Sequence, residues 1–220
     1  LLGLTLQDYR SALAQSAWLQ GEAGAPLVLA DERLYLNRLY QAEQQVKQQI
    51  NRRVSTVLPL PVNIAEQLEA LFPPTEKTDP DWQKLACALA VRSAFTMITG
   101  GPGTGKTTTV VKLLALLQLG AAQQQRELII KLAAPTGKAA ARMAEAIRNA
   151  KAALPVSEAI KAALPDEART LHRLLGSRGD SPQVRHHAAN PLALDVLVVD
   201  EASMVDLALM AKLLDALPPS

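Results

Sequence analysis

The alternation of hydrophobic and polar positions divides the chain into two parts with different rhythms. Residues 1–20 carry apolar positions at helical spacing, which predicts a helix. Two short apolar runs at residues 26–30 and 33–36 lie on either side of two acidic residues, and this arrangement predicts a β-hairpin. From residue 36 to residue 50, one narrow apolar stripe among many glutamines predicts a helix that packs along a single side.

Prolines mark the end of this first part, at positions 59, 61, 73, 74 and 80. Because proline fixes φ and disfavours helix at the residue before it, we expect a domain junction near residues 73–80. The sequence therefore predicts a small, mainly helical N-terminal domain over residues 1–75 and a second domain over residues 76–220.

Beyond the junction, helical segments alternate with strands that are almost uniformly apolar. The expected helices span residues 82–92, 106–119 and 138–150, and the expected strands span residues 94–99, 128–134 and 195–199. Strands without a polar face, separated by helices, are typical of a parallel sheet buried between two helical layers. The predicted fold class is therefore α/β, with a parallel sheet covered by helices on both faces.

Composition narrows the classes of protein without identifying one. The 220 residues are 49% hydrophobic and 20% charged, which is ordinary for a globular protein. No apolar run approaches the roughly 18 residues that a membrane span needs, and the start of the chain has no signal-peptide pattern. Cys87 is the single cysteine, so no internal disulfide can form, and we expect a reducing cytoplasm.

Charge is spread unevenly along the chain. The net charge is only +2, but residues 126–180 hold ten Lys or Arg against six Asp or Glu. A polyanion would therefore meet the middle of the chain. Charge alone favours the plainer interpretation, a solvated helical face.

A glycine-rich segment from Gly100 to Thr107 is the strongest chemical signal in the chain. It matches the G-x-x-x-x-G-K-[ST] pattern of a P-loop in full, between an apolar run and a helix-forming run. Glycines let backbone N–H groups converge on phosphate oxygens, and the following helix directs its N-terminus at the same anion. Lys106 is expected to reach the β- and γ-phosphates of ATP, and Thr107 to offer its hydroxyl to Mg²⁺. The predicted nucleotide-binding residues here are Gly101, Pro102, Gly103, Thr104, Gly105, Lys106, Thr107 and Thr108.

Two carboxylates follow the last predicted strand. Asp200 and Glu201 come directly after four apolar residues, at the end of a strand, where open α/β sheets place their ligands. Asp200 is expected to hold Mg²⁺, usually through water, and Glu201 to polarise the attacking water. Lys106, Asp200 and Glu201 form the predicted catalytic set, and Thr107 and Asp200 are the predicted metal ligands.

Several segments resemble the motifs of superfamily-1 DNA helicases, in the same order along the chain. Trp82–Ala86 looks like the upstream glutamine motif, whose amide, here that of Gln83, reads the adenine edge. Ala133–Ala140 and Thr170–Gly176 are similar to two segments that contact DNA, and Asp200–Met204 resembles the Asp-Glu box. Within this superfamily, nearly the whole chain resembles the RecD family, the α subunits of bacterial exodeoxyribonuclease V (RecBCD).

The resemblance implies DNA contacts at two places. Thr136 and Lys138 lie after a strand and at a helix start, where N–H groups and a cation would hold a phosphate, and Arg142 lies one helical turn further. His172 and Arg173 would add another backbone contact. Without the resemblance, Lys138 and Arg142 fit solvated helix charges about equally well. Because no aromatic residue follows the glycine-rich loop in the sequence, we expect contacts to phosphates rather than stacking on bases.

The resemblance also implies an activity and partners. It indicates an ATP-driven motor that moves 5′ to 3′ on single-stranded DNA, within a bacterial complex that processes DNA ends during double-strand-break repair and homologous recombination. The partners would be DNA ends and the β and γ subunits, RecB and RecC, with the nuclease site on another subunit. The N-terminal domain of the family docks onto a partner subunit, which suits residues 1–72.

The ends of the chain predict a piece of a larger protein. The chain lacks an initial methionine and stops about 20 residues after the Asp-Glu box. In the family, a third motif and a second motor domain with an arginine finger follow that box. We therefore expect an N-terminal fragment with little ATPase activity of its own.

Two other functions remain open at this point. Other P-loop ATPases carry similar glycine loops, although the 94 residues between Lys106 and Asp200 and the segments before Asp200 favour a helicase. Alternatively, the chain serves chiefly as a docking module that retains a nucleotide-binding remnant. The intact glycine loop and Asp-Glu box favour a true motor domain.

Overall fold

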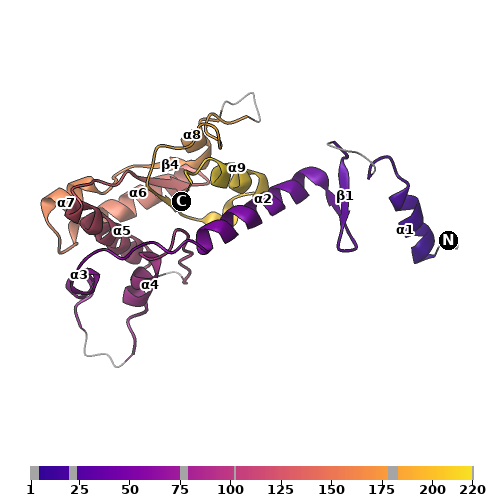
Figure 1. Ribbon diagram of the computed structural model, residues 1–220. Coiled ribbons are helices and arrows are strands. Elements are labelled where there is room, and N and C mark those ends of the chain that lie inside the picture. Colours follow the sequence, from indigo (N-terminus) through magenta and orange to yellow (C-terminus); the bar gives the residue numbers. More distant parts are fainter. Residues whose placement is uncertain (1–4, 20–23, 75–78, 102, 178–182, 220) are drawn as a thin grey trace.

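The computed structural model describes residues 5–19, 24–74, 79–101, 103–177 and 183–219. Figure 1 shows a body built around a small sheet, and an arm that extends away from it. The arm is formed by the described residues between 5 and 54. No helix in these residues is both long and apolar enough to cross a membrane.

The arm begins with helix α1 (Leu6–Ala14), which is shorter than the helix predicted over residues 1–20. Thr5 starts it with a capping box, because the Thr5 hydroxyl accepts from the Asp8 N–H and the Asp8 carboxylate accepts from the Thr5 N–H. A turn ends it, in which the Ser16 carbonyl accepts from the Leu19 N–H.

The predicted hairpin follows. Strands β1 (Leu27–Ala30) and β2 (Arg33–Leu36) pair antiparallel. Asp31 and Glu32 between them have φ values of 47° and 62°, and a two-residue turn with both φ values positive matches the twist of the flanking strands. Helix α2 (Asn37–Val54) continues from β2 and runs back to the body, where its second half packs against helix α9 (Figure 1).

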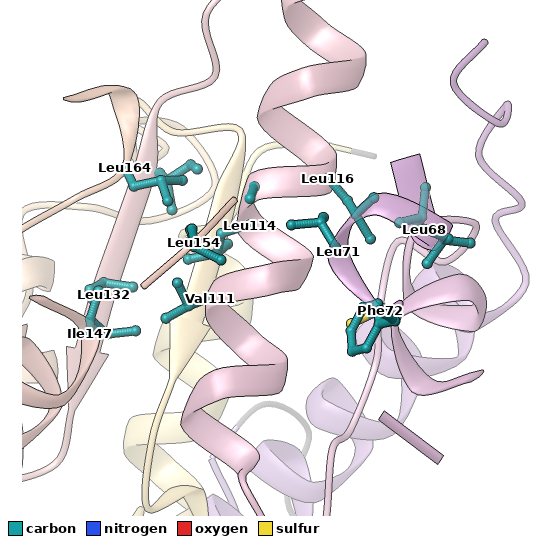
Figure 2. Packing of buried hydrophobic residues seen from close by; sticks show 14 of the residues in the cluster. Leu68, Leu71, Phe72, Val111, Leu114, Leu116, Leu132, Ile147, Leu154 and Leu164 are labelled. Carbon is teal, nitrogen blue, oxygen red and sulfur yellow. The ribbon is translucent and has the colours of Figure 1, made fainter. Parts of the chain in front are cut away.

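Helix α5 (Lys106–Gln123) lies at the centre of the larger hydrophobic core. In Figure 2, leucines from helix α3 (Ile64–Leu71) lie on one side of α5, and Leu132 and Ile147 lie on the other. Helix α4 (Trp82–Ala90) packs against α5 as well, and contributes the buried Cys87. Residues before the predicted junction therefore share a core with residues after it, and the boundary at residues 75–76 stays a prediction.

A three-stranded parallel sheet forms the middle layer of the body. Strand β3 (Ile130–Ala134) lies between β4 (Ala168–Thr170) and β5 (Val196–Val199). Successive residues of β3 serve opposite faces, because Leu132 belongs to the core around α5 and Ala133 to a second core on the other side. Helices thus cover both faces of a parallel sheet, as the sequence predicts.

The remaining helices complete the two layers. Helices α6 (Gly137–Ala152) and α7 (Glu158–Ala163) pack on the side of α5. Helices α8 (Leu171–Leu175) and α9 (Leu207–Asp215) supply leucines to the second core. A 3₁₀ turn, η1 (Ala202–Met204), leads from the end of β5 towards α9.

Two strand assignments from the sequence are corrected. Residues 94–99 were expected to form a strand but have no strand conformation, and Met97 is 74% exposed. An apolar run becomes a strand only beside a partner for its N–H and C=O groups, and residues 94–99 pair with none of the described residues. Strand β4 was not expected, because three residues are too short to show periodicity and pairing with β3 creates it.

Candidate nucleotide and DNA site

The glycine-rich loop adopts a conformation that its glycines make possible. Gly103 and Gly105 have φ values of 76° and 78°, a region that residues with a Cβ rarely adopt. Gly105 is the N-cap of α5, and no side chain caps the first N–H groups of that 18-residue helix. A Cβ at Gly103 would meet nothing within 4 Å, so the space beside it is open. Pro102, one of the predicted nucleotide-binding residues, lies outside the described residues.

The ammonium group of Lys106 lies across the same loop. Its Nζ donates to the carbonyl oxygens of Gly100 at 2.5 Å and Gly101 at 2.9 Å. The Thr104 hydroxyl also donates to Gly101 O, at 2.9 Å. A phosphate bound in the loop would replace these two carbonyls as the partner of Lys106. Thr107 is half-buried in the first turn of α5, and the neighbouring Thr108 is exposed.

Helix α4 brings Gln83 to the glycine-rich loop. The Asp81 carboxylate caps α4 by accepting from the N–H groups of Gln83 and Lys84, at 3.0 Å each. The Gln83 amide then donates from Nε2 to the Thr104 carbonyl oxygen at 3.0 Å. The predicted adenine-reading residue therefore lies against the phosphate loop and contacts its backbone.

Asp200 and Glu201 lie at the carboxyl end of β5. The Asp200 N–H donates to Ala133 O at 2.9 Å, which fixes the end of β5 beside the end of β3. The Asp200 carboxylate accepts from the Glu201 N–H at 2.9 Å. Glu201 has a φ of 51°, in the left-handed region. Both side chains are exposed, and within the described residues no hydrogen bond or ion pair joins them to the glycine-rich loop.

Thr136 and Thr170 begin helices at adjacent strand ends. The Thr136 hydroxyl caps α6 by accepting from the Ala139 N–H at 3.2 Å, and the Thr170 hydroxyl caps α8 by accepting from the Arg173 N–H at 3.3 Å. Because Ala134 pairs with Thr170 in the parallel register of β3 and β4, the two helix starts are neighbours. The other predicted DNA-binding side chains, all exposed, are Lys138, Arg142, His172 and Arg173.

The structure also shows basic residues that the sequence did not single out. Arg148 of α6 and Arg169 of β4 line the same surface hollow as Arg173. The only sequence signal for them was the excess of basic residues between positions 126 and 180. Spacing along the chain could not reveal them, because three different elements bring them together.

The residues of the loop fit a nucleoside triphosphate with a divalent cation. The free N–H groups at the uncapped start of α5 and the Lys106 ammonium are donors for phosphate oxygens, and the open space beside Gly103 leaves room for them. Hydroxyl and carboxylate oxygens, such as those of Thr107 and Asp200, are the ligands that Mg²⁺ prefers. The described residues contain no group of three or more His, Cys, Asp or Glu that could hold a metal ion, so phosphate oxygens and water would complete the shell.

Comparison with known proteins places this site in a family. The AAA domain family matches residues 83–220, which include every residue of the glycine-rich loop and the Asp-Glu pair. The chain belongs to the AAA domain family. The matched region begins in helix α4, at the glutamine that contacts the phosphate loop, and includes α9.

Several proteins that are similar to this chain are RecD proteins. Over an alignment of 227 residues the chain is 44% identical to the RecBCD enzyme subunit RecD of Haemophilus influenzae, covering 98% of this chain and 35% of that one. The RecD subunit of Mycolicibacterium smegmatis is 43% identical over 212 residues, covering 92% of this chain and 37% of that one. The ATP-dependent RecD2 DNA helicase of Deinococcus radiodurans is 41% identical over 125 residues, covering 56% of this chain and 14% of that one.

These similarities confirm the resemblance to RecD that the sequence motifs indicated. These relatives are RecD subunits and a DNA helicase, and none of the three is a P-loop ATPase of another class. The chain spans only 35% and 37% of the length of the two RecD relatives, so it corresponds to about a third of such a protein.

Proposed function

We propose that this chain carries the first motor domain of an ATP-dependent DNA helicase that moves 5′ to 3′ and acts as the RecD subunit of exodeoxyribonuclease V. In this role it serves double-strand-break repair and homologous recombination in the bacterial cytoplasm, with RecB and RecC as partner subunits. One observation carries the proposal: a phosphate loop and an Asp-Glu box occur together in this chain, and 98% of the chain aligns with a RecD subunit at 44% identity.

The nucleotide site works through groups that converge on the phosphates of ATP. Lys106 exchanges the carbonyl oxygens of Gly100 and Gly101 for phosphate oxygens. Thr107 and Asp200 would hold Mg²⁺, which would neutralise charge on the transferred phosphoryl group. Glu201 orients and polarises the attacking water. Gln83 couples binding of the adenine base to the conformation of the loop, because its amide donates to the loop backbone.

The DNA strand lies over the carboxyl edge of the sheet. The starts of α6 and α8 are neighbours there, and Thr136, Lys138, Arg142, His172 and Arg173 provide donors for successive phosphates. Described residues from β3 onward include no Phe, Tyr or Trp side chain, so binding depends on phosphate contacts and weakens as salt rises.

The arm is the part that docks onto a partner subunit. It exposes large apolar side chains that a single soluble chain usually buries, and this supports an interface with another protein. These side chains are Leu6, Tyr9, Trp18, Leu29, Leu34, Leu36 and Leu39.

The test measures ATP turnover by the full-length protein, assembled with its partner subunits, with and without single-stranded DNA. We expect DNA to stimulate turnover, and Lys106→Ala to abolish it while the melting temperature stays unchanged, because the hydrogen bonds of its ammonium group to described residues go to the loop alone. Lys47→Ala, an exposed lysine of α2, is the matched control. Equal turnover with and without DNA would argue against a helicase.

Two further measurements separate the motor from a nucleotide-binding remnant. Glu201→Gln is expected to bind ATP and lose hydrolysis, and loss of binding would mean that its role is misassigned. The 220-residue chain, which spans 35% of the length of the Haemophilus influenzae RecD subunit, is expected to turn over ATP more slowly than the full-length protein, because an arginine supplied in trans contributes about 10³–10⁵ in rate at related sites. Turnover by the 220-residue chain as rapid as that of the full-length protein would contradict this expectation.

A further inference from the structure

A surface hollow of about 460 Å³ lies beside strand β4, outside the residues assigned to nucleotide binding. Three guanidinium groups line it, each from a different element: Arg148 from α6, Arg169 from β4 and Arg173 from α8. Asp166 and Glu167, just before β4, and two alanines complete the lining. Its lining contains no aromatic or large apolar side chain.

The positive charge of the hollow is largely uncompensated. The Asp166 carboxylate is held by the Lys151 ammonium at 2.8 Å. Arg148 uses one N–H on the Asp166 backbone carbonyl, at 3.1 Å, and keeps its other donors. The guanidinium groups of Arg169 and Arg173 form no hydrogen bond or ion pair with the described residues. The hollow therefore holds three guanidinium groups, and Glu167 is the one carboxylate of its lining that Lys151 does not neutralise.

We propose that this hollow binds a phosphodiester group of the DNA strand and extends the row of phosphate contacts beyond the starts of α6 and α8. The proposal rests on the proposed function. Arg173 belongs both to the hollow and to the Thr170–Gly176 segment, so a strand crossing that segment passes directly over the hollow. Planar guanidinium groups match the geometry of phosphate oxygens and bind them in pairs.

The lining favours nucleic acid over an acidic protein segment. The core of a protein–protein interface usually contains aromatic or large apolar side chains, and here the uncharged lining is only Ala144 and Ala168. Three arginines without base-reading neighbours instead suit a repeating backbone of phosphates. The site is therefore indifferent to base sequence.

The test measures binding of fluorescent oligo(dT) to the full-length protein by anisotropy, over a range of salt concentrations. We expect Arg148→Gln and Arg169→Gln each to weaken binding about fivefold at 0.1 M salt. Each is also expected to lower the slope of log affinity against log salt by about 0.7, the value for one phosphate contact on a single strand. Arg38→Gln, an exposed arginine of the arm, makes the same change of charge away from the hollow and is expected to change neither quantity.

The outcomes distinguish this site from the wider assignment. If the unmodified protein does not bind the oligonucleotide, the helicase proposal and this one both fail. If it binds, and Lys138→Gln weakens binding while the two hollow variants keep its affinity and slope, only the hollow is misassigned. If the hollow variants keep DNA affinity but no longer assemble with the partner subunits, the hollow is a protein site and the proposal is overturned. Circular dichroism and melting curves establish that each variant is folded.

Discussion

The guanidinium group of Arg53, near the end of α2, donates from Nη2 to the main-chain carbonyl oxygen of Leu214, 161 residues later, at 3.5 Å. The same nitrogen lies 3.4 Å from the carbonyl oxygen of Pro218, and Nη1 donates to Gln49 Oε1 at 2.5 Å. Arg53 is 5% exposed. Because carbonyls at the end of a helix have no partner within it, Arg53 acts as a C-terminal cap of α9 supplied by the arm.

Removing this cap is expected to destabilise the body. Arg53→Met keeps the apolar stem but leaves the buried Leu214 carbonyl oxygen at the end of α9 without its donor, which costs about 1–3 kcal/mol. The measurement is the free energy of unfolding from urea denaturation. Arg52→Met is the control, because Arg52 is exposed and its side chain is expected to change stability by less than about 0.5 kcal/mol. Equal losses in the two variants would mean that Arg53 does not anchor α9.

Gln83 and Gly105 predict a coupling between α4 and the phosphate loop. A Cβ at Gly105 would overlap Gln83 Nε2, whereas a Cβ at Gly103 would meet open space. Both glycines have positive φ, so alanine at either position costs about 1 kcal/mol in backbone strain. Gly105→Ala is therefore expected to cost more stability and more nucleotide affinity than Gly103→Ala.

A double-mutant cycle separates the overlap from the strain. Gln83→Ala removes the amide that the new methyl group would strike, so the double variant is expected to lose less than the two single losses together. The coupling is expected to be about 0.5–3 kcal/mol, as for residues in contact. Melting curves and titration with a fluorescent nucleotide measure both effects. Additive losses would show that the overlap relaxes without cost.

The sequence predicted the parts of this structure that depend on local chemistry. The hairpin was predictable because two short apolar runs flank two polar residues, and the loop before α5 because its glycines and lysine follow a fixed spacing. The prediction of a strand over residues 94–99 was wrong. A strand forms only beside another strand with which it shares hydrogen bonds, and an apolar run does not show whether such a partner is present. Arg148 and Arg169 were missed for a related reason, since only the packing of α6 against β4 gives them a common hollow.

From the backbone conformation of Glu201 we expect that one substitution raises the stability of the protein while it removes catalysis. Its φ of 51° lies in a region that costs about 1 kcal/mol for a residue other than glycine, asparagine or aspartate. Glu201→Asn is expected to raise the free energy of unfolding by about 0.5–1 kcal/mol while hydrolysis is lost. Glu201→Gln, with the same strain, is the matched control and is expected to leave stability unchanged. If both variants are equally stable, the left-handed conformation carries no measurable strain.

Cys87 predicts how stability changes with pH. Burial raises the pKa of this thiol to about 12, and its sulfur lies 3.4 Å from the Thr109 carbonyl oxygen. In the unfolded chain the thiol has its ordinary pKa of 9.0, whereas in the folded chain it keeps the proton up to about pH 12. The contribution of the thiol to stability is therefore complete well below pH 9.0 and falls as the pH rises, by up to about 1.4 kcal/mol for each unit. Urea denaturation of the unmodified protein and Cys87→Ala between pH 7 and pH 10.5 measures this, and the difference between the two is expected to shrink as the pH rises. Groups common to both proteins cancel in that difference, so parallel curves would mean that the thiol ionises as readily in the folded chain as in the unfolded one.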